Sequence, residues 1–245
     1  MAPLDRLRFF ASENRAAYRM WFRWHCFKLQ KRKQLPRPGD PLYFDGFPRS
    51  GNTYFTAGLK KVFPGLQFAN NLHAVAPIRM ALDAGVPAIV LMREPSESVA
   101  SYVLHIQSPI TQSSKKQRNE AELCELLLWQ WHNYYLWVKR LEPQLKVVLS
   151  ERAFSDPAGV AELVATETGL DVERSVIESR WHEFHQSFKE KDKTKRQGST
   201  SFPSEARDRQ KLRVSELISM SSRLAECKRL YEEISLTATL QERAP

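Results

Sequence analysis

The chain has 245 residues, which suffices for one α/β domain with a buried core and at most a small appendage. Hydrophobic residues make up 42% and charged residues 27% of the chain, which disfavours global disorder, collagen-like repetition and a fibrous heptad array. With 37 Lys and Arg residues against 28 Asp and Glu residues, the formal net charge is +9, which favours anionic partners such as phosphates, sulfates, nucleic acid or an acidic membrane surface.

The cysteines indicate a reducing compartment. Cys26, Cys124 and Cys227 are odd in number, far apart in the sequence and without C-x-x-C spacing, so neither a disulfide framework nor a zinc knuckle is expected. No run of about eighteen apolar residues occurs, which disfavours a membrane-spanning segment or a secretion signal. We therefore expect a cytoplasmic protein, and because no His–His or His–Cys spacing fits zinc, no metal.

Residues 1–37 are expected to form a basic helical segment that packs on or beside the core. Between Arg6 and Lys33, apolar side chains are interspersed with nine Lys or Arg residues. A second interpretation of this segment is an amphipathic helix that makes a peripheral contact with anionic lipid. The proline-rich stretch Leu35–Pro41 cannot be helical, so it marks the entry into the main domain, residues 38–245.

Short apolar runs and helical patterns then alternate, as in βα units. The predicted strands are Leu42–Asp45, Leu66–Ala69, Ala88–Met92 and Leu145–Leu149. Helices are predicted from Gly51 to Val62, from Pro95, from Asn119, from Asp156-Pro157 to Gly169, and from Ser215 to Ile234, with a solvated basic loop at Lys189–Arg196. This order predicts a three-layer α/β fold, with a mostly parallel central sheet flanked by helices.

A glycine-containing loop follows the first predicted strand. From Gly46 to Thr53 the sequence keeps the spacing G-x-x-x-x-G-x-T, in which glycines allow backbone N–H groups to converge on phosphate oxygens at the start of a helix. Asn52 stands where an ATP- or GTP-binding loop has its lysine, and a cation occurs three residues earlier as Arg49. An ordinary kinase or GTPase therefore fits poorly.

A second cluster follows the strand at Ala88–Met92. Arg93, Glu94 and Pro95 come directly after it, and Ser101 lies eight residues beyond the arginine. An arginine at the carboxyl end of a parallel strand points into the crevice where such sheets bind ligands, and the serine hydroxyl could help to hold a second phosphate. A salt bridge between Arg93 and Glu94 or Glu97 at the helix start is the alternative interpretation.

Together these motifs make the chain resemble the sulfotransferases that use 3′-phosphoadenosine 5′-phosphosulfate (PAPS). The family's 5′-phosphosulfate motif matches Pro48, Arg49, Ser50, Gly51, Asn52, Thr53 and Tyr54, and its 3′-phosphate motif, R-[DNE]-P-x5-S, matches Arg93-Glu94-Pro95 and Ser101. The later run Val147–Pro157 is similar to a strand, turn and helix start of the same family. The resemblance implies a P-loop-NTPase-like sulfotransferase fold, with PAPS as co-substrate and no metal, and in-line transfer of a sulfuryl group to a hydroxyl or amine.

The resemblance also implies roles for single residues. His73 lies between the two phosphate motifs, where the family places its proton acceptor, and His105 is the second candidate. Arg49 would stabilise the leaving group electrostatically, since guanidinium keeps its charge. Of the family's C-terminal cap over the nucleotide, only Arg196-Gln197-Gly198 is similar, so Arg196 and Gly198 are candidate cofactor contacts, while the second glycine and the tryptophan of that cap are missing.

Two other classes of function remain open from the sequence: a P-loop nucleotide or small-molecule kinase, and a non-catalytic basic module that binds nucleic acid or membrane. In the preferred interpretation no nucleic acid is bound, and the acceptor is a small molecule or a carbohydrate. Its pocket is expected to be built by the segment after His73, the stretch His105–Arg118, Trp129, Trp181 and Phe184. His182 and His185 are expected only to flank the basic loop. The sequence does not indicate an oligomeric state.

Overall fold

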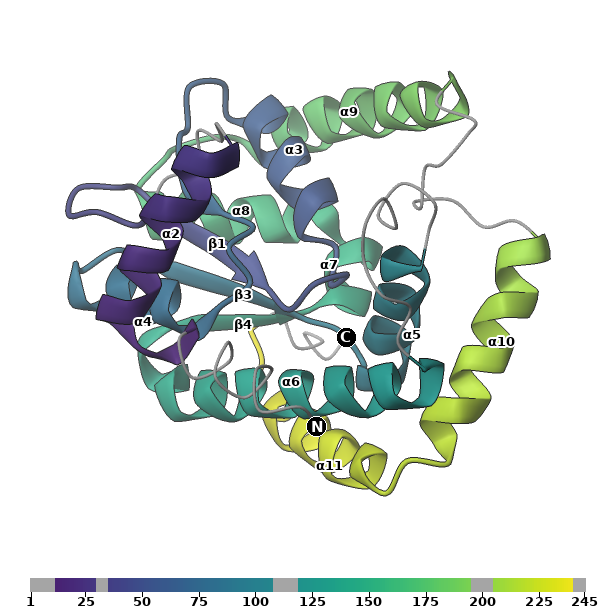
Figure 1. The fold of residues 1–245 in the computed structure, drawn as a ribbon. Coiled ribbons are helices and arrows are strands. Elements are labelled where there is room, and N and C mark those ends of the chain that lie inside the picture. Colours follow the sequence, from purple (N-terminus) through teal and green to yellow (C-terminus); the bar gives the residue numbers. More distant parts are fainter. Residues whose placement is uncertain (1–11, 30–34, 108–118, 195–204, 240–245) are drawn as a thin grey trace.

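The sheet at the centre of the molecule has four parallel strands in the order β2-β1-β3-β4 (Figure 1). The computed structural model describes residues 12–29, 35–107, 119–194 and 205–239. The strands are β1 (Tyr43–Gly46), β2 (Ala69–Asn70), β3 (Ala88–Met92) and β4 (Lys146–Leu149). In the register of β1 and β3, Gly46 pairs with Leu91, so the two segments that carry the phosphate motifs leave neighbouring strands at the same edge.

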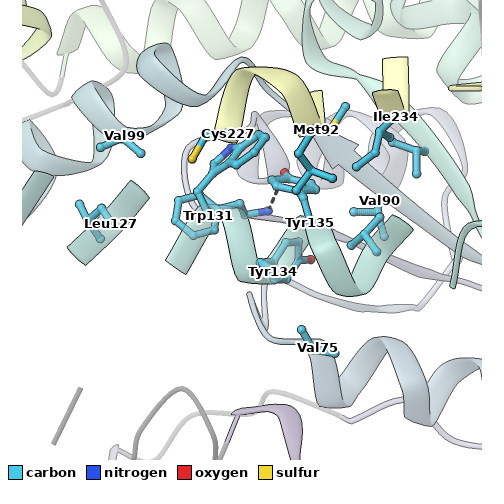
Figure 2. Packing of buried hydrophobic residues seen from close by; sticks show 14 of the residues in the cluster. Val75, Val90, Met92, Val99, Leu127, Trp131, Tyr134, Tyr135, Cys227 and Ile234 are labelled. Carbon is cyan, nitrogen blue, oxygen red and sulfur yellow. Dashed lines mark hydrogen bonds between the residues drawn. The ribbon is translucent and has the colours of Figure 1, made fainter. Parts of the chain in front are cut away.

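Helices cover both faces of this sheet, which confirms the predicted three-layer α/β architecture (Figure 1). One side carries α3 (Asn52–Val62), α8 (Pro157–Thr168) and α9 (Arg174–Thr194). The other carries α4 (Val75–Asp83), α5 (Pro95–Ile106), α6 (Glu120–Leu141), α10 (Glu205–Ser219) and α11 (Arg223–Ser235). Alternate residues of β3 serve the two cores: Figure 2 shows Val90 and Met92 near Trp131 and Tyr135 of α6, whereas Leu91 faces the α3 side.

Several helices begin and end at the residues that the sequence indicates. Glu94 accepts a hydrogen bond from the N–H of Glu97 and Pro95 takes the first turn of α5. Asn119 caps α6 by accepting from the N–H of Ala121. Asp156 caps α8, which ends at Gly169 in the left-handed conformation.

The C-terminal part of the chain differs from the prediction in two places. The single helix expected over residues 215–234 is wrong, because the chain breaks between α10 and α11, where Ser221 Oγ accepts a hydrogen bond from the N–H of Arg223 and starts a new helix. The prediction of a loop over residues 189–196 is also wrong for residues 189–194, which belong to α9. A short helix, α7 (Ser150–Ser155), follows β4 where only a turn was expected.

The N-terminal region contributes α2 (Arg15–Leu29), which packs against α4 at the periphery of the molecule (Figure 1). Tyr18 and Phe22 are buried there in a cluster with Ala76 and Met80 of α4. Among the helices of the described residues, none is long and apolar enough to cross a membrane.

Candidate active site

A cavity of about 580 Å³ opens at the carboxyl edge of β1 and β3. Crevices at this edge are the usual ligand sites of parallel sheets. The lining residues are Pro48, Arg49, Gly51, Asn52, Thr53, Tyr54, His73, Arg93, Tyr102, His105, Phe154, His185, Phe188 and Lys189. Arg, Lys and His side chains are present among these described lining residues and Asp and Glu are not, so the cavity suits an anion.

The glycine loop connects β1 to α3 and forms one wall of this cavity. Gly51 adopts φ 96° as the N-cap of α3, a conformation that glycine takes without steric cost. A Cβ at Gly46 would lie 2.4 Å from the carbonyl oxygen of Leu91, so this position also has no room for a side chain. Both glycines of the predicted motif are therefore required by the geometry, one for its backbone conformation and one for close packing against β3.

Side chains from three other elements hold the loop from behind. The carbonyl oxygens of residues 48, 49 and 50 each accept a hydrogen bond, from Ser98 Oγ at 3.1 Å, Arg93 Nη1 at 3.2 Å and Ser150 Oγ at 2.8 Å, respectively. The trans peptide places N–H and C=O on opposite sides of the bond. Tying three consecutive carbonyl groups to other parts of the chain therefore fixes the peptide planes of the loop, and the N–H of Ser50 donates to the carbonyl oxygen of Phe47 at 3.2 Å.

The structure brings the two predicted phosphate motifs together. Arg49 Nε donates to Ser101 Oγ at 3.1 Å, and Arg93 Nη1 reaches the carbonyl oxygen of Arg49. Arg93 also forms an ion pair with Glu97 at 3.0 Å, one of the partners expected from the sequence, and Glu97 in turn binds Lys211 of α10 at 2.6 Å. Two guanidinium groups from the segments that follow β1 and β3 thus line one cavity.

Asn52, at the position of the missing lysine, fixes the loop from within. Its side chain is buried, and Nδ2 donates to the carbonyl oxygens of Gly46 and Phe47 at 3.0 and 3.1 Å. Tyr135 of α6 supports the same loop, since its hydroxyl accepts from the N–H of Phe47 at 3.2 Å and donates to the carbonyl of Leu91 at 2.7 Å. Where an ATP- or GTP-binding loop has a charged lysine, this loop therefore has a neutral side chain that holds its backbone through two hydrogen bonds.

His73 lies at the cavity with one ring nitrogen directed to the protein. Nδ1 is 2.8 Å from the carbonyl oxygen of Gly46 and 3.1 Å from Asp45 Oδ1, which are both acceptors. Asn52 Nδ2 lies 3.4 Å from Nδ1, but its two hydrogens are engaged by the loop carbonyls. The proton of neutral His73 is therefore assigned to Nδ1, which leaves the lone pair on Nε2. The ring itself lines the cavity.

Asp45 is the partner behind His73 and is fully buried at the end of β1. Its Oδ2 accepts three hydrogen bonds, from the Tyr43 hydroxyl at 2.6 Å and from the N–H groups of Leu72 and His73 at 3.0 and 2.7 Å. Burial by itself raises the pKa of this carboxyl, but when His73 is protonated its charge and hydrogen bond, together with Tyr43 and the backbone, outweigh burial and lower the pKa overall. Asp45 therefore stays ionised and holds the segment that carries His73.

Aromatic side chains form the wall opposite the glycine loop. The Tyr54 ring lies 5.4 Å from Phe154 and 5.3 Å from Phe188 between ring centroids, and all three rings line the cavity. His185 also lines it, with Nδ1 2.9 Å from the Tyr54 hydroxyl, and burial followed by the charge of Lys189 lowers its pKa. The interpretation of His185 as a mere flank of a basic loop is therefore wrong.

Two of the predicted acceptor-pocket residues, Trp181 and Phe184, do not line the cavity, whereas His105 does. Trp181 and Phe184 are buried in the core, because α9 packs against α3 at Gly58, where a Cβ would come within 2.6 Å of the Trp181 ring. His105 does line the cavity and stacks on Tyr102 with 6.4 Å between ring centroids. Arg196 and Gly198 lie outside the described residues, as does the stretch 108–118.

Sequence reasoning missed Asp45 as a site residue, and with it Tyr102, Phe154 and Phe188. Asp45 had a visible signal, since a carboxylate in the otherwise apolar predicted strand Leu42–Asp45 requires a buried partner. The aromatic residues had none, because Tyr102, Phe154 and Phe188 lie on three different helices, α5, α7 and α9, that only the tertiary fold brings to one cavity. Within the described residues, no group of three or more His, Cys, Asp and Glu side chains is arranged to hold a metal ion.

Sheet, loop and cavity together define a three-layer α/β protein with a cavity lined by basic side chains at the carboxyl edge of its sheet. Two solved structures share this architecture. Mouse sulfotransferase SULT7A1 complexed with PAP gives a TM-score of 0.50 at 13% identity, covering 81% of this chain and 91% of that one. Retinol dehydratase in complex with androsterone and inactive cofactor PAP gives a TM-score of 0.50 at 13% identity, covering 85% and 84%.

The chain therefore has the sulfotransferase fold, as the resemblance in the sequence implied. No protein-family model and no curated protein matches the sequence.

Proposed function

We propose that this protein transfers a sulfuryl group from PAPS to a hydroxyl or amine of a small-molecule or carbohydrate acceptor. The observation that carries the proposal is the contact between Arg93 and Arg49, which joins the two phosphate motifs in one cavity beside His73. The two structural neighbours are complexes with PAP, which is what remains of PAPS after the sulfuryl group has left.

The cavity offers a separate place for each part of the nucleotide. The loop from Pro48 to Thr53 and the N-terminus of α3 would hold the 5′-phosphosulfate, through backbone N–H groups and the partial positive charge of the helix end. Arg93 and Ser101 would hold the 3′-phosphate by charge-assisted hydrogen bonds. The wall of Tyr54, Phe154 and Phe188 provides stacking surface for a purine base.

The transfer requires one bond to form and one to break at sulfur. The acceptor oxygen or nitrogen bonds to sulfur while the bond from sulfur to the 5′-phosphate oxygen breaks, and PAP leaves with the electron pair of that bond. His73 Nε2 accepts the proton that the acceptor loses. Arg49 lies in the same cavity and, being permanently charged, offsets the negative charge that builds up on the leaving phosphate.

Asp45 acts on this reaction through His73. The Gly46 carbonyl accepts the proton of Nδ1, the charge of Oδ1 at 3.1 Å favours that tautomer, and Oδ2 anchors the backbone N–H of His73 itself. The carboxylate also stabilises the imidazolium that forms when Nε2 takes up a proton. Asp45 is thus a positioning residue, since it fixes the tautomer and the orientation of the base without touching the substrates.

The two alternative functions receive no comparable support. A kinase would need a carboxylate for magnesium near the loop, but the described residues that line the cavity include no Asp or Glu, and Asp45 beside the loop is fully buried with its Oδ2 engaged by three donors. A purely non-catalytic basic module would not explain a His–Asp pair at a phosphate-type loop. The buried free thiols of Cys124 and Cys227 agree with the reducing cytoplasm that we propose as the location.

Calorimetry with adenosine 3′,5′-bisphosphate tests the nucleotide site directly. We expect Arg93→Ala to weaken binding by at least about 30-fold, because a charge-assisted contact is lost. The matched control Arg229→Ala removes an exposed arginine on α11 and should leave affinity unchanged. Equal affinity in wild type and Arg93→Ala would refute the assignment of the second phosphate motif.

Turnover is tested separately with labelled PAPS and a panel of phenol, sugar and alcohol acceptors. His73→Ala should bind the bisphosphate normally and lose transfer, since only the proton acceptor is removed. Magnesium-dependent ATP or GTP turnover without transfer from PAPS would favour the kinase instead.

A further inference from the structure

Helix α2 has two apolar faces: one packs against α4, and the other carries large side chains that are mostly exposed. Tyr18 and Phe22, four residues apart, pack against α4. Met20 and Trp24 form a second i, i+4 pair, displaced from the first by two residues and so by about 200° around the helix. Their exposed fractions are 74% and 59%, and Trp21 beside them is 45% exposed. A globular helix would normally carry polar side chains on this outer face.

The same helix is strongly basic. Its sequence contains Arg and Lys at positions 15, 19, 23 and 28 and no Asp or Glu. Arg15 forms an ion pair with Asp83 of α4, whereas Arg19 and Arg23 are exposed and directly precede Met20 and Trp24. Cations therefore flank the exposed apolar pair along the helix.

We propose that α2 binds the surface of an anionic lipid bilayer, with Met20 and Trp24 entering the headgroup region and Arg19 and Arg23 contacting lipid phosphates. Tryptophan and basic residues on one helix face are the composition of helices that lie in this interface. A nucleic-acid surface would attract the arginines but would give no reason for exposed Met and Trp. A second copy of the chain would bring the arginines of two α2 helices together, which is unfavourable.

This surface is connected to the candidate active site. The Tyr18 hydroxyl donates to the carbonyl oxygen of Leu72 at 3.4 Å, and Leu72 directly precedes His73. The helix that would rest on the bilayer is therefore the one that supports the segment carrying the proposed base. If the proposed function holds, membrane binding would place the enzyme where lipid-associated acceptors are present.

Co-sedimentation of the full chain with vesicles tests the proposal. We expect binding to phosphatidylcholine vesicles containing phosphatidylserine, little binding to pure phosphatidylcholine, and loss of binding at high salt. Met20→Ala/Trp24→Ala should weaken binding by about tenfold or more, through lost apolar burial. Arg19→Gln/Arg23→Gln should weaken it by roughly fivefold for each arginine, as expected for a basic residue near an anionic bilayer.

Matched controls distinguish binding through α2 from non-specific hydrophobic or electrostatic binding of vesicles. Met220→Ala, at a methionine that is also 74% exposed, and Arg229→Gln on α11 should leave vesicle binding unchanged. Far-UV circular dichroism confirms folding, and bisphosphate calorimetry on the α2 variants keeps this test independent of the proposed function. The proposal is overturned if both α2 variants bind vesicles like wild type, if duplex DNA rather than vesicles is bound, or if Met20 and Trp24 prove to be buried in a dimer in solution.

Discussion

Asp45→Asn is the substitution that tests the proposed chemistry most directly. It removes the negative charge behind His73 and introduces a hydrogen-bond donor, while the volume of the side chain hardly changes. The position of Oδ2 accepts from three donors, so the carbonyl oxygen of the new asparagine must occupy it. The amide nitrogen then takes the position of Oδ1, 3.1 Å from His73 Nδ1. A donor would face the ring nitrogen that carries the proton, which favours the opposite tautomer with hydrogen on Nε2 and no lone pair for the substrate.

The size of the effect follows from two contributions. A unit charge about 4 Å from the imidazolium is worth about 4 kcal/mol at an effective dielectric constant of about 20. His73 is about a third exposed, at 31%, so solvent screens part of this energy and about 2 kcal/mol remains, or roughly 30-fold in kcat. The wrong tautomer costs more, because general acid–base catalysis as a whole contributes about 10²–10⁴-fold. The Gly46 carbonyl at 2.8 Å still favours a proton on Nδ1, so we expect a loss of about 100-fold or more without complete inactivation.

The assay is kcat at saturating PAPS, measured together with the affinity for the bisphosphate and the melting temperature. Asp45→Asn should lower kcat and leave bisphosphate affinity unchanged, and Asp156→Asn, a helix cap that asparagine serves equally well, is the matched control. Because the pKa of Asp45 is lowered in the folded protein, its carboxylate stabilises the fold above the ordinary value of 3.8. That stability is lost as pH falls below 3.8, so the difference in melting temperature between wild type and variant should narrow there. A variant kcat within about threefold of wild type would refute the role of Asp45.

Three further outcomes follow from the packing. Gly46→Ala should lower the free energy of unfolding by at least about 1–3 kcal/mol in urea titrations, because the new methyl group meets the backbone of β3 at 2.4 Å; wild-type stability would contradict the close packing. Burial raises the pKa of Cys124 to about 11 and of Cys227 to about 12, so neither thiol should react with iodoacetamide at neutral pH until the protein is unfolded, as mass spectrometry would show. Phe154→Ala should weaken bisphosphate binding by roughly tenfold in calorimetry through lost stacking, and an unchanged affinity would remove this ring from the nucleotide site.

The sequence predicts the parts of the fold that depend on local signals. The buried run of β3 begins and ends as expected, because five apolar residues between turn signals have few other structures open to them. The caps at Asn119 and Asp156 likewise act through neighbours two or three residues away. The break between α10 and α11 was missed because both segments are amphipathic and no Gly or Pro separates them. Only the hydrogen bond of Ser221 and the separate packing of the two helices produce it.

In the candidate site, too, some features could be predicted from the sequence and others could not. The proximity of Arg49 and Arg93 could be predicted, since each follows a strand and the two strands are neighbours in the sheet. The role of Asp45 could not, because it depends on hydrogen bonds to residues 27 and 28 positions further along the chain. Contacts over such a separation are set by how the segment after β2 folds back against β1. No periodicity or spacing in the sequence contains that information.

Strained backbone conformations occur both in the glycine loop and in the segment that carries His73. Within the described residues, three residues other than glycine have positive φ: Arg49 at 73°, Asn71 at 54° and His73 at 52°. Each such conformation costs about 1–2 kcal/mol, so the sum is an appreciable share of a typical stability of about 5–15 kcal/mol. The strain persists because other groups hold the backbone: Arg93 binds the carbonyl of Arg49, and Asp45 accepts from the N–H of His73. The same two contacts that impose the strained conformations also set the geometry of the anion site and of the base. Each strained segment is thus held by a partner from another part of the chain, which ties the shape of the site to the tertiary fold.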